Sequence, residues 1–524
     1  MKTLRSALFF LLLYSLLMVP GYSPAQKPDK HALKSITPAL MKEYIGFLAS
    51  DALAGRNTPS PGLDTAAAFI ARTFRANNVA PLNGNYFQPF YLCKTDLDTG
   101  CYLQIVKEGK ISDIPLKTGF IPYYLSNSKV FTGEAVFAGY GITAPEYQYD
   151  DYAGLDVKNK AVLVFRHEPC DNDSGSFFEG REPTRYSGVI YKQETAEKQG
   201  AGALLVVSEP GAYPSLKPRG YIWPSLSKNF PADAAPYTLC DNENKDIPAI
   251  QIGAEAIKSI FGSIDSLRSL QTRIDKSRFP HPLQLPGVEI RLKINARNDQ
   301  RQVVNVVGYL EGSDPVLKNE IVVIGAHYDH VGINDLKKTG EDNIFNGADD
   351  NASGTSGVMA LARAFAMSKN KPRRSMLFLL FAGEEKGLYG SAVYTAHPLL
   401  PLEKTVAMLN LDMIGRNSPK TLYLVGASTS PDIAAITKKE NRKTGFKLID
   451  DNSVMGGSDH YNFFEKGIPF MFYFTGLHKD YHQVGDNPDK INYEKAARVT
   501  RLVYLTAWHI ANESRHYKLN TSKN

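Results

Sequence analysis

The sequence predicts an α/β fold in which a mixed, mostly parallel sheet is flanked by helices. Apolar runs typical of buried strands occupy 321–326, 376–381, 405–411 and 470–474. Helical patterns lie between and after them, at Val358–Phe365, 430–443 and 494–512, the last of these amphipathic. The chain has 524 residues, which exceeds a single typical core, so two domains are expected.

Each predicted strand is followed by residues that can bind a proton or a metal. His327-Tyr-Asp329-His330 follows the first strand, Glu384-Glu385 the second and Asp412 the third. The best candidate after the fourth strand is His482, within the segment 480–486. Because the carboxyl ends of parallel strands meet at one edge of a sheet, we expect these side chains to lie together.

Asp350 adds a carboxylate where the turn-rich segment 346–354 (NGADDNASG) enters a helix. Taken alone, Asp349-Asp350 could cap that helix, and a lone strand-terminal histidine is more often a core residue. The order and adjacency of the whole set favour a metal site. Imidazoles and carboxylates suit zinc, and five ligands exceed one tetrahedral ion, so we expect Asp350 to bridge two. The predicted ligands are His327, Asp350, Glu385, Asp412 and His482.

These motifs resemble those of the co-catalytic dizinc aminopeptidases, such as bacterial leucyl aminopeptidase and yeast vacuolar aminopeptidase Y. Glutamate carboxypeptidase II, the transferrin receptor and glutaminyl cyclase are related to that family. The resemblance implies a phosphorylase/hydrolase-like zinc peptidase core. The matching segments follow the family's order: AHYDHVG (326–332), NGADDNASG (346–354), AGEEKGLYGS (382–391), LNLDMIG (409–415), GGSDHYNF (456–463) and DYHQVGD (480–486).

The resemblance also implies a role for each residue and two Zn²⁺ ions per chain. One ion would take Asp350, His327 and Asp412, and the other would take Asp350, Glu385 and His482. Glu384 would be the general base that accepts a proton from a zinc-bridging water. Tyr481 resembles the phenol that stabilises the oxyanion, with a core tyrosine as the alternative. Asp329 is expected to orient the His327 imidazole through its other nitrogen.

The peptidase domain is expected to be discontinuous. Residues 30–129 would form its N-terminal part and residues 280–515 its catalytic part. Between them, 130–279 has short strands and turns rich in Gly, Tyr and Pro, and the segment 149–157 looks like part of a protease-associated domain. This mainly-β insert would be either a lid that shapes substrate access or a passive addition.

Residues 1–25 have the pattern of a signal peptide. Lys2 and Arg5 precede an apolar core from Ala7 to Val19, and Ser23-Pro-Ala25 resembles a cleavage site. We therefore expect an exported protein, periplasmic or extracellular, that begins near Gln26 and has no stable membrane insertion; an uncleaved anchor is the alternative. The 60 basic and 54 acidic residues give a formal charge of +6, which is too small an excess to indicate nucleic acid as a partner.

Four cysteines lie outside the metal motifs, and an oxidising compartment permits disulfides. The pairing that keeps each bridge local joins Cys93 to Cys101 and Cys170 to Cys240. Four cysteines allow three connectivities, and four unpaired buried thiols are the alternative to any bridge.

Three functions are compatible with these observations. The first is a zinc aminopeptidase acting on peptides. The second is a carboxypeptidase or a glutaminyl cyclase on the same scaffold, and Arg416 could then bind a substrate carboxylate, although a structural role is more common for such an arginine. The third is a non-enzymatic binding protein of the transferrin-receptor type, which would be expected to have lost ligands. The sequence carries no signal for side-chain preference or oligomeric state.

Overall fold

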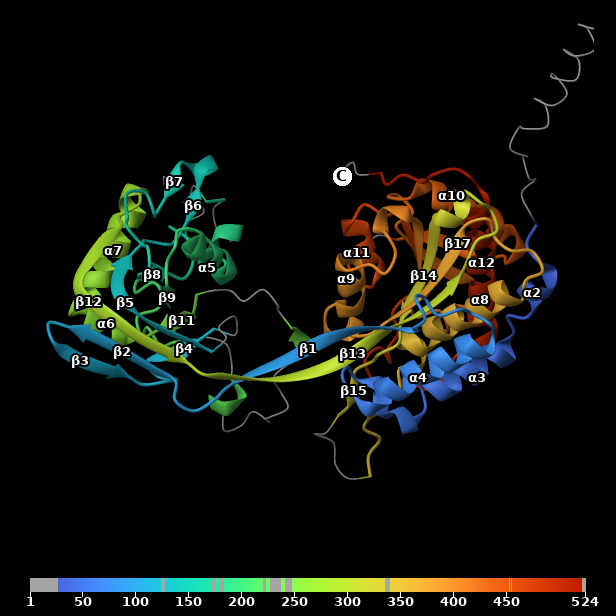
Figure 1. The fold of residues 1–524 in the computed structure, drawn as a ribbon, viewed down its shortest axis with the longest axis horizontal. Helices are drawn as coiled ribbons and strands as arrows, with labels where there is room; N and C mark the ends of the chain where they lie inside the picture. Colours follow the sequence, from blue (N-terminus) through green and yellow to red (C-terminus); the bar gives the residue numbers. More distant parts are fainter. Residues whose placement is uncertain are drawn as a thin grey trace, which may run out of the picture. The chain divides into compact units, whose positions relative to one another are not determined.

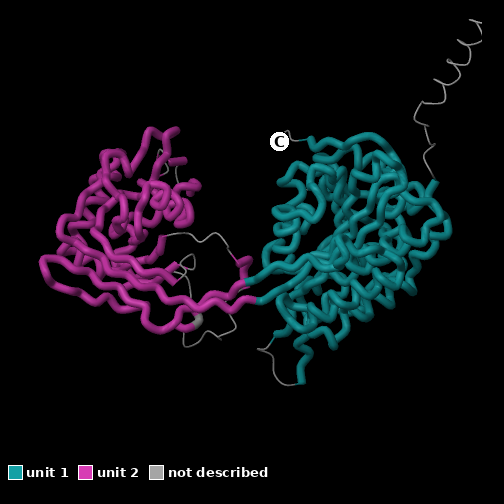
Figure 2. The backbone as a smooth tube through the Cα atoms, in the orientation of Figure 1, with its two compact units in different colours: residues 1–92, 301–524 teal, residues 93–300 magenta. Residues whose placement is uncertain are grey.

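The computed structural model describes residues 27–123, 128–171, 173, 176, 178–179, 183–219, 223–226, 237–240, 247–334, 340–451, 453 and 455–520. The predicted signal peptide lies outside the described residues. The chain forms two compact units, one from residues 1–92 and 301–524 and the other from Cys93–Gln300 (Figure 2). None of the helices in the described ranges is both long and apolar enough to cross a membrane.

A nine-stranded sheet forms the centre of the first unit (Figure 1), although its residues 93–97, 238–239 and 296–300 fall in the range of the second unit. Its order is β10 (Thr238–Leu239), β1 (Phe87–Leu97), β13 (Ala296–Leu310), β17 (Ser375–Phe381), β14 (Ile321–His327), β18 (Thr405–Leu411), β21 (Phe470–Phe474), β19 (Thr421–Val425) and β20 (Lys447–Asp450). The central strands β17, β14, β18 and β21 are parallel to one another, whereas β13 and β19 join them antiparallel. The predicted mixed α/β fold is confirmed.

Helices cover both faces of this sheet (Figure 1). On one face, α8 (Gly354–Met367) and α12 (Tyr493–Asn512) lie on β14 and β18, and α10 (Pro431–Glu440) packs on α12 and β21. The helices α2 (Lys30–Lys34) and α3 (Pro38–Leu48) pack on α8, and α4 (Pro61–Ala76) lies beside α8 with its Phe74 against Phe378 of β17. On the other face, α9 (Tyr389–Ala396) and α11 (His460–Glu465) place Tyr394 and Phe463 against alternate strand residues such as Leu379 and Phe472. Burial on both faces explains why the central strands are continuously apolar.

The described residues of the second unit form an eight-stranded sheet and three α-helices. Its strand order is β3 (Lys110–Ile114), β2 (Tyr102–Lys107), β12 (Leu283–Ile294), β5 (Lys129–Phe137), β8 (Ala161–Phe165), β9 (Ala203–Val207), β11 (Ala249–Ile252) and β4 (Phe120–Pro122). The helices are α5 (Val189–Lys198), α6 (Ala254–Phe261) and α7 (Ile264–Ser277). A short pair of strands, β6 (Thr143–Ala144) with β7 (Tyr149–Asp150), also lies in this unit, whereas a second such pair, β15 (Gly332–Ile333) with β16 (Ile344–Phe345), belongs to the first unit.

This second unit is wider than the expected insert, 130–279. Strands β2, β3 and β4 lie before residue 130, but β2 pairs with β12, β3 pairs with β2 and β4 pairs with β11, so all three belong to this sheet. Strand β12 lies after residue 279 and pairs with both β2 and β5. Hydrogen bonding between strands distant in sequence therefore sets the boundary, and the assignment of this unit as a protease-associated domain stays a prediction.

The predicted local disulfides are wrong. Cys93 bonds to Cys240, and Cys101 and Cys170 are free. Cys93 lies in β1 and Cys240 directly follows β10, its neighbour in the sheet, so their Cα atoms come within 4.8 Å. The Cys101 thiol instead lies 3.4 Å from the Asn295 carbonyl oxygen. Closeness in sequence was therefore a poor guide, because strand pairing brings together cysteines that are 147 residues apart.

Candidate metal centre

The five predicted ligands gather at the carboxyl-terminal edge of β17, β14, β18 and β21. His327 is the last residue of β14, Asp412 follows β18, and Glu385 lies in the short 3₁₀ turn after β17. Asp350 precedes α8, and His482 lies in the loop after β21 with a left-handed backbone conformation, φ 52°. Such a conformation is uncommon for a residue other than glycine and is often found at functional sites.

His327 lies at the centre of the first group of potential ligands. Its Nε2 is 3.4 Å from Asp350 Oδ1, 3.3 Å from Asp412 Oδ2 and 4.0 Å from Glu384 Oε2. The side chains of His327, Asp350 and Asp412 are buried. This group could hold one cation.

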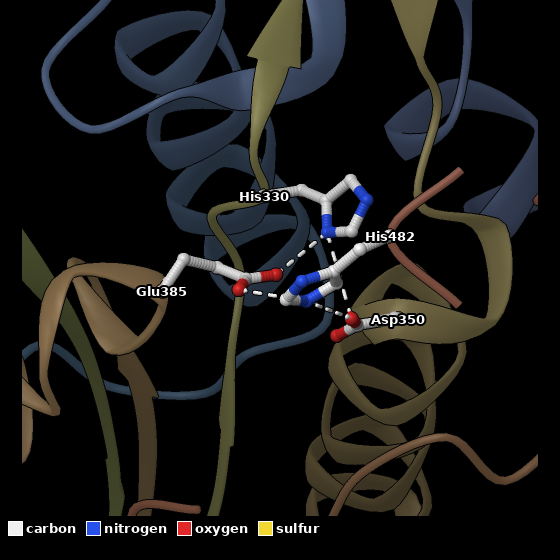
Figure 3. A group of neighbouring side chains, drawn as sticks. All are labelled: His330, Asp350, Glu385 and His482. Carbon is white, nitrogen blue, oxygen red and sulfur yellow. Dashed lines mark hydrogen bonds and ion pairs between the residues drawn. The ribbon is translucent and has the colours of Figure 1, made fainter. Parts of the chain in front are cut away.

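His482 lies at the centre of the second group (Figure 3). Its Nε2 is 3.1 Å from Asp350 Oδ2 and 3.0 Å from Glu385 Oε2. The two oxygens of Asp350 therefore face different imidazoles, His327 on one side and His482 on the other. A carboxylate in this arrangement can bridge two ions.

The donor atoms fit zinc. Zinc binds nitrogen and oxygen at 2.0–2.2 Å, so two ligands of one tetrahedral ion lie about 3.3 Å apart. The contacts of His327 and His482 with their carboxylates, 3.0–3.4 Å, are close to that value. Among the described residues, several buried site atoms lack a hydrogen-bond partner, including Asp350 Oδ2, Asp412 Oδ1 and His482 Nε2. Buried charges of this kind normally pair or coordinate metals.

The electrostatics of the site agree with the donor geometry. Burial lowers the pKa of His482, but the neighbouring carboxylates of Asp350 and Glu385 outweigh burial and raise that pKa to about 10. A cation bound there would take the place of that proton. Burial raises the pKa of Glu384 well above its usual range. The positive charge of His327 acts to lower this pKa, whereas the negative charge of Asp459 raises it further. A carboxylate with a raised pKa is a stronger base.

Asp329 contacts its neighbours differently from what the sequence suggested. The backbone carbonyl of Asp329 lies 3.3 Å from His327 Nδ1, whereas its carboxylate is 3.6 Å away. The carboxylate accepts hydrogen bonds from the Thr58 hydroxyl, at 2.9 Å, and from the Glu384 backbone N–H, at 3.2 Å. Asp329 is therefore placed to orient both His327 and the turn that carries Glu384.

Tyr481 is the most exposed of the predicted residues, with 38% of its surface accessible. Its ring stacks on that of His482, with centroids 3.9 Å apart. Burial of part of the side chain and the nearby carboxylates of Asp350 and Glu385 raise the pKa of the phenol. The hydroxyl therefore keeps its proton and can donate a hydrogen bond.

Several residues around the ligands support the site. Sequence reasoning assigned no role to Asp486, His330 or Arg56, and for Arg416 it named a structural role as the more common one. Asp486 accepts hydrogen bonds from the backbone N–H groups of Asp349 and Asp350, each at 3.0 Å. Arg416 pairs with Asp480 at 2.6 Å and with Asp486 at 3.4 Å. His330 contacts Glu385, and Arg56 donates to the backbone beside the ligands. His330 lies in the motif 326–332 and Asp486 in the motif 480–486, and these motifs were the only indication in the sequence that the two residues lie near the site.

Comparison with known proteins gives one family match and several relatives. Residues 305–507 match the model of peptidase family M28. A probable zinc metalloprotease from Pyricularia oryzae is 27% identical over 44% of this chain and 53% of its own. A probable leucine aminopeptidase from Trichophyton verrucosum is 29% identical over 38% of this chain and 56% of its own. Aminopeptidase YwaD from Bacillus subtilis is 27% identical over 44% of this chain and 49% of its own. The chain thus spans about half the length of these relatives.

Solved structures of similar arrangement include an aminopeptidase from Aneurinibacillus sp. strain AM-1. It is 22% identical, with a TM-score of 0.46, over 94% of this chain and 97% of that chain.

Proposed function

Because residues 305–507 match the model of peptidase family M28, we propose that the protein is an exported zinc aminopeptidase that removes N-terminal residues from peptides. The observation that carries the proposal is the Asp350 carboxylate, whose two oxygens face the His327 and the His482 groups. The names of the relatives, zinc metalloprotease and leucine aminopeptidase, support the same activity.

In the proposed site, Asp350, His327 and Asp412 would hold one Zn²⁺ ion, and Asp350, Glu385 and His482 would hold a second. Zinc supplies Lewis-acid chemistry, which activates water and polarises the scissile carbonyl. Glu384 Oε2 lies 4.0 Å from His327 Nε2, beside the first group, where it can accept a proton and pass it to the leaving amine. The Tyr481 hydroxyl can donate to the carbonyl oxygen as negative charge develops there.

The charges around the site favour a free α-amine over a free α-carboxylate. The carboxylates of Glu384, Asp412 and Asp459 lie close enough together to influence one another's protonation, and they attract an ammonium group. A carboxypeptidase needs a free basic group, and Arg416 is already paired with Asp480 and Asp486. These observations support the aminopeptidase over the carboxypeptidase alternative.

The central test is a hydrolysis screen. We expect turnover of aminoacyl-nitroanilides and no turnover of their N-acetylated forms. Cleavage from the carboxyl end of N-blocked peptides, or cyclisation of N-terminal glutamine without hydrolysis, would reject the aminopeptidase proposal.

Metal analysis tests the two-ion arrangement. Purified protein should carry close to two zinc ions per chain, and chelation should abolish activity until Zn²⁺ is returned. Full activity with a single ion would remove the bridging role of Asp350.

We also propose that residues 1–25 are removed on export and that the second unit is the protease-associated domain. N-terminal sequencing of the active protein should find a start near Gln26. Active, membrane-bound protein that begins at Met1 would establish an anchor instead.

A further inference from the structure

His330 is a fully buried imidazole that touches the second group of ligands (Figure 3). Its Nδ1 lies 2.7 Å from Glu385 Oε1 and 3.7 Å from Asp350 Oδ2. The other ring nitrogen, Nε2, has no hydrogen-bond partner among the described residues. The carboxylate of Glu385 is therefore held between two imidazoles, with Oε1 facing His330 and Oε2 facing His482.

The distances separate a hydrogen-bond donor from a metal ligand. Two ligands of one tetrahedral zinc ion lie about 3.3 Å apart. The contacts of His482 with Asp350 and Glu385, at 3.1 and 3.0 Å, approach that separation. The contact of 2.7 Å between His330 and Glu385 is shorter and has the length of a charge-assisted hydrogen bond. Nδ1 of His330 therefore donates to Oε1 of Glu385, which leaves Oε2 free for the cation.

The packing around the ring holds His330 in this orientation. A Cβ atom at Gly347 would come within 2.6 Å of the His330 ring, so only glycine fits beside the imidazole. The backbone N–H of His330 donates to the Arg56 carbonyl at 3.2 Å. The His482 ring meets the His330 ring edge-on, with centroids 5.6 Å apart.

We propose that His330 is a positioning residue for the second zinc ion, acting through a hydrogen bond from Nδ1 to Glu385. The proposal rests on the zinc site of the proposed function but not on the identity of the substrate. Loss of a partner that orients a metal ligand typically weakens metal binding about 10- to 100-fold. We expect a loss of that size when the donor at Nδ1 is removed.

Two amide substitutions test which ring nitrogen matters. The side-chain amide of Asn can place its N–H near the position of Nδ1, whereas that of Gln reaches the position of Nε2. His330→Asn should therefore bind zinc within a few-fold of the parent, while His330→Gln and His330→Ala should bind the second zinc ion about 10- to 100-fold more weakly. Zinc affinity is measured by competition with a chromogenic chelator, and thermal unfolding of the metal-free forms checks the fold.

The order of the variants distinguishes positioning from packing and from direct ligation. Gln is closer in volume to His than Asn is, so a role in packing alone predicts that Gln is tolerated better. A direct zinc ligand predicts that Asn and Ala lose affinity alike. Either result, or unchanged affinity in His330→Ala, would overturn the proposal.

His460 provides the matched control. It is a second buried imidazole, whose Nε2 lies 2.7 Å from the Met455 carbonyl and whose ring packs on Phe470 and Phe472. His460→Asn and His460→Gln should leave zinc affinity unchanged. Zinc binding is measured without substrate, so this test does not depend on peptidase activity. A protein that binds two zinc ions but cleaves no peptide would reject the proposed function, and the zinc affinities of the variants would still decide the role of His330.

Discussion

Glu384 and Glu385 are adjacent in the chain, yet they face different parts of the site. Glu384 Oε2 is 4.0 Å from His327, whereas Glu385 contacts His330 and His482 at 2.7 and 3.0 Å. The 3₁₀ turn after β17 separates their side chains, so neighbouring residues of the same type can divide the work of base and ligand.

This division predicts opposite outcomes for two matched substitutions. Glu384→Gln should keep the fold and both zinc ions while kcat falls roughly 10²- to 10⁴-fold, because the general base is lost. Glu385→Gln should lose zinc first. Each change removes one negative charge, so a general electrostatic effect would make the two variants alike. A Glu384→Gln enzyme with turnover within a few-fold of the parent and unchanged zinc content would end the proposed role of Glu384.

A second residue-scale prediction concerns Asp151, which is buried in the second unit. Its carboxylate accepts hydrogen bonds from the backbone N–H groups of Tyr140 and Ile142 and from the Tyr149 hydroxyl. Burial raises the pKa of Asp151 to about 7, although these hydrogen bonds and Lys192 act to lower it. Between about pH 4 and pH 7 the folded protein therefore binds more protons than the unfolded chain.

The contribution of Asp151 to the stability of the second unit should therefore decrease as the pH rises from 4 to 7. One pKa unit corresponds to about 1.4 kcal/mol, so the loss is of the order of a few kcal/mol. Asp151→Asn should flatten this dependence, as measured by chemical denaturation across that range. Asp156→Asn is the control, since Asp156 is exposed and its pKa is lowered, first by the backbone N–H of Lys158. Equal pH dependence in the parent and Asp151→Asn would contradict the prediction.

The ligand candidates could be predicted from the sequence, whereas the residues that support them could not. The five ligand candidates were predictable because each follows an apolar strand or a glycine-rich turn in a familiar order, and they lie together, although their roles stay predictions. His330 and Asp486 were given no role, because the motifs that contain them do not show which of their polar residues contact a ligand or its backbone. No local pattern encodes such a contact.

At the scale of elements, the 3₁₀ segment Asp51–Arg56 connects the N-terminal helices to the ligand loops. The buried Arg56 guanidinium donates to the carbonyl oxygens of Tyr328, Asn346 and Gly347, at 3.0, 2.7 and 3.1 Å, and also to that of Leu48. Burial lowers the pKa of Arg56 to about 10, so the group stays positive at neutral pH beside Asp329 and Asp350. A single side chain thus fixes the backbone that follows His327 and precedes Asp350.

Arg56→Lys tests this connection. The ammonium group of lysine lacks the planar fork of donors of a guanidinium and cannot reach four carbonyl oxygens. Some of these buried acceptors therefore lose their hydrogen bonds, and each loss lowers the free energy of unfolding by about 1–3 kcal/mol. We expect a lower melting temperature and weaker zinc binding, measured by thermal unfolding and chelator competition. Arg72→Lys, at an exposed position on α4, should change stability by less than about 0.5 kcal/mol. A fully stable Arg56→Lys variant with parental zinc affinity would contradict this role.

Elements with uniform burial were easier to predict than the long strands. The runs at 376–381 and 405–411 correspond closely to β17 and β18, because burial on both faces leaves a continuous apolar sequence. Strands β12 and β13 are longer and include charged, largely exposed stretches such as 297–302. Such stretches lack the apolar run or clean alternation that identifies a strand, and the domain boundaries predicted near them were displaced as a result.

At the scale of the whole molecule, the Cys93–Cys240 bridge closes a loop of 147 residues. A crosslink over so long a loop restricts the unfolded chain, and the chain-entropy model assigns it up to about 5 kcal/mol. Cys93→Ser/Cys240→Ser should therefore lose roughly 2–5 kcal/mol in chemical denaturation while the zinc content of the folded protein is kept. Cys101→Ser/Cys170→Ser removes two thiols and leaves the bridge intact, and it should differ little from the parent. Equal stability of the two double variants would show that the bridge adds nothing.

The order of the candidate ligands along the chain has a consequence for biosynthesis. They occur at 327, 350, 385, 412 and 482. The second imidazole, His482, and the strand before it, β21, are therefore synthesised last, after the other four ligands have left the ribosome. A growing chain offers carboxylates without their full set of imidazoles and cannot hold both ions. If the chain crosses a membrane unfolded, as the predicted export implies, it acquires its metal only after arrival. The zinc supply of the outer compartment, and not that of the cell interior, would then decide how much of the newly made protein becomes active.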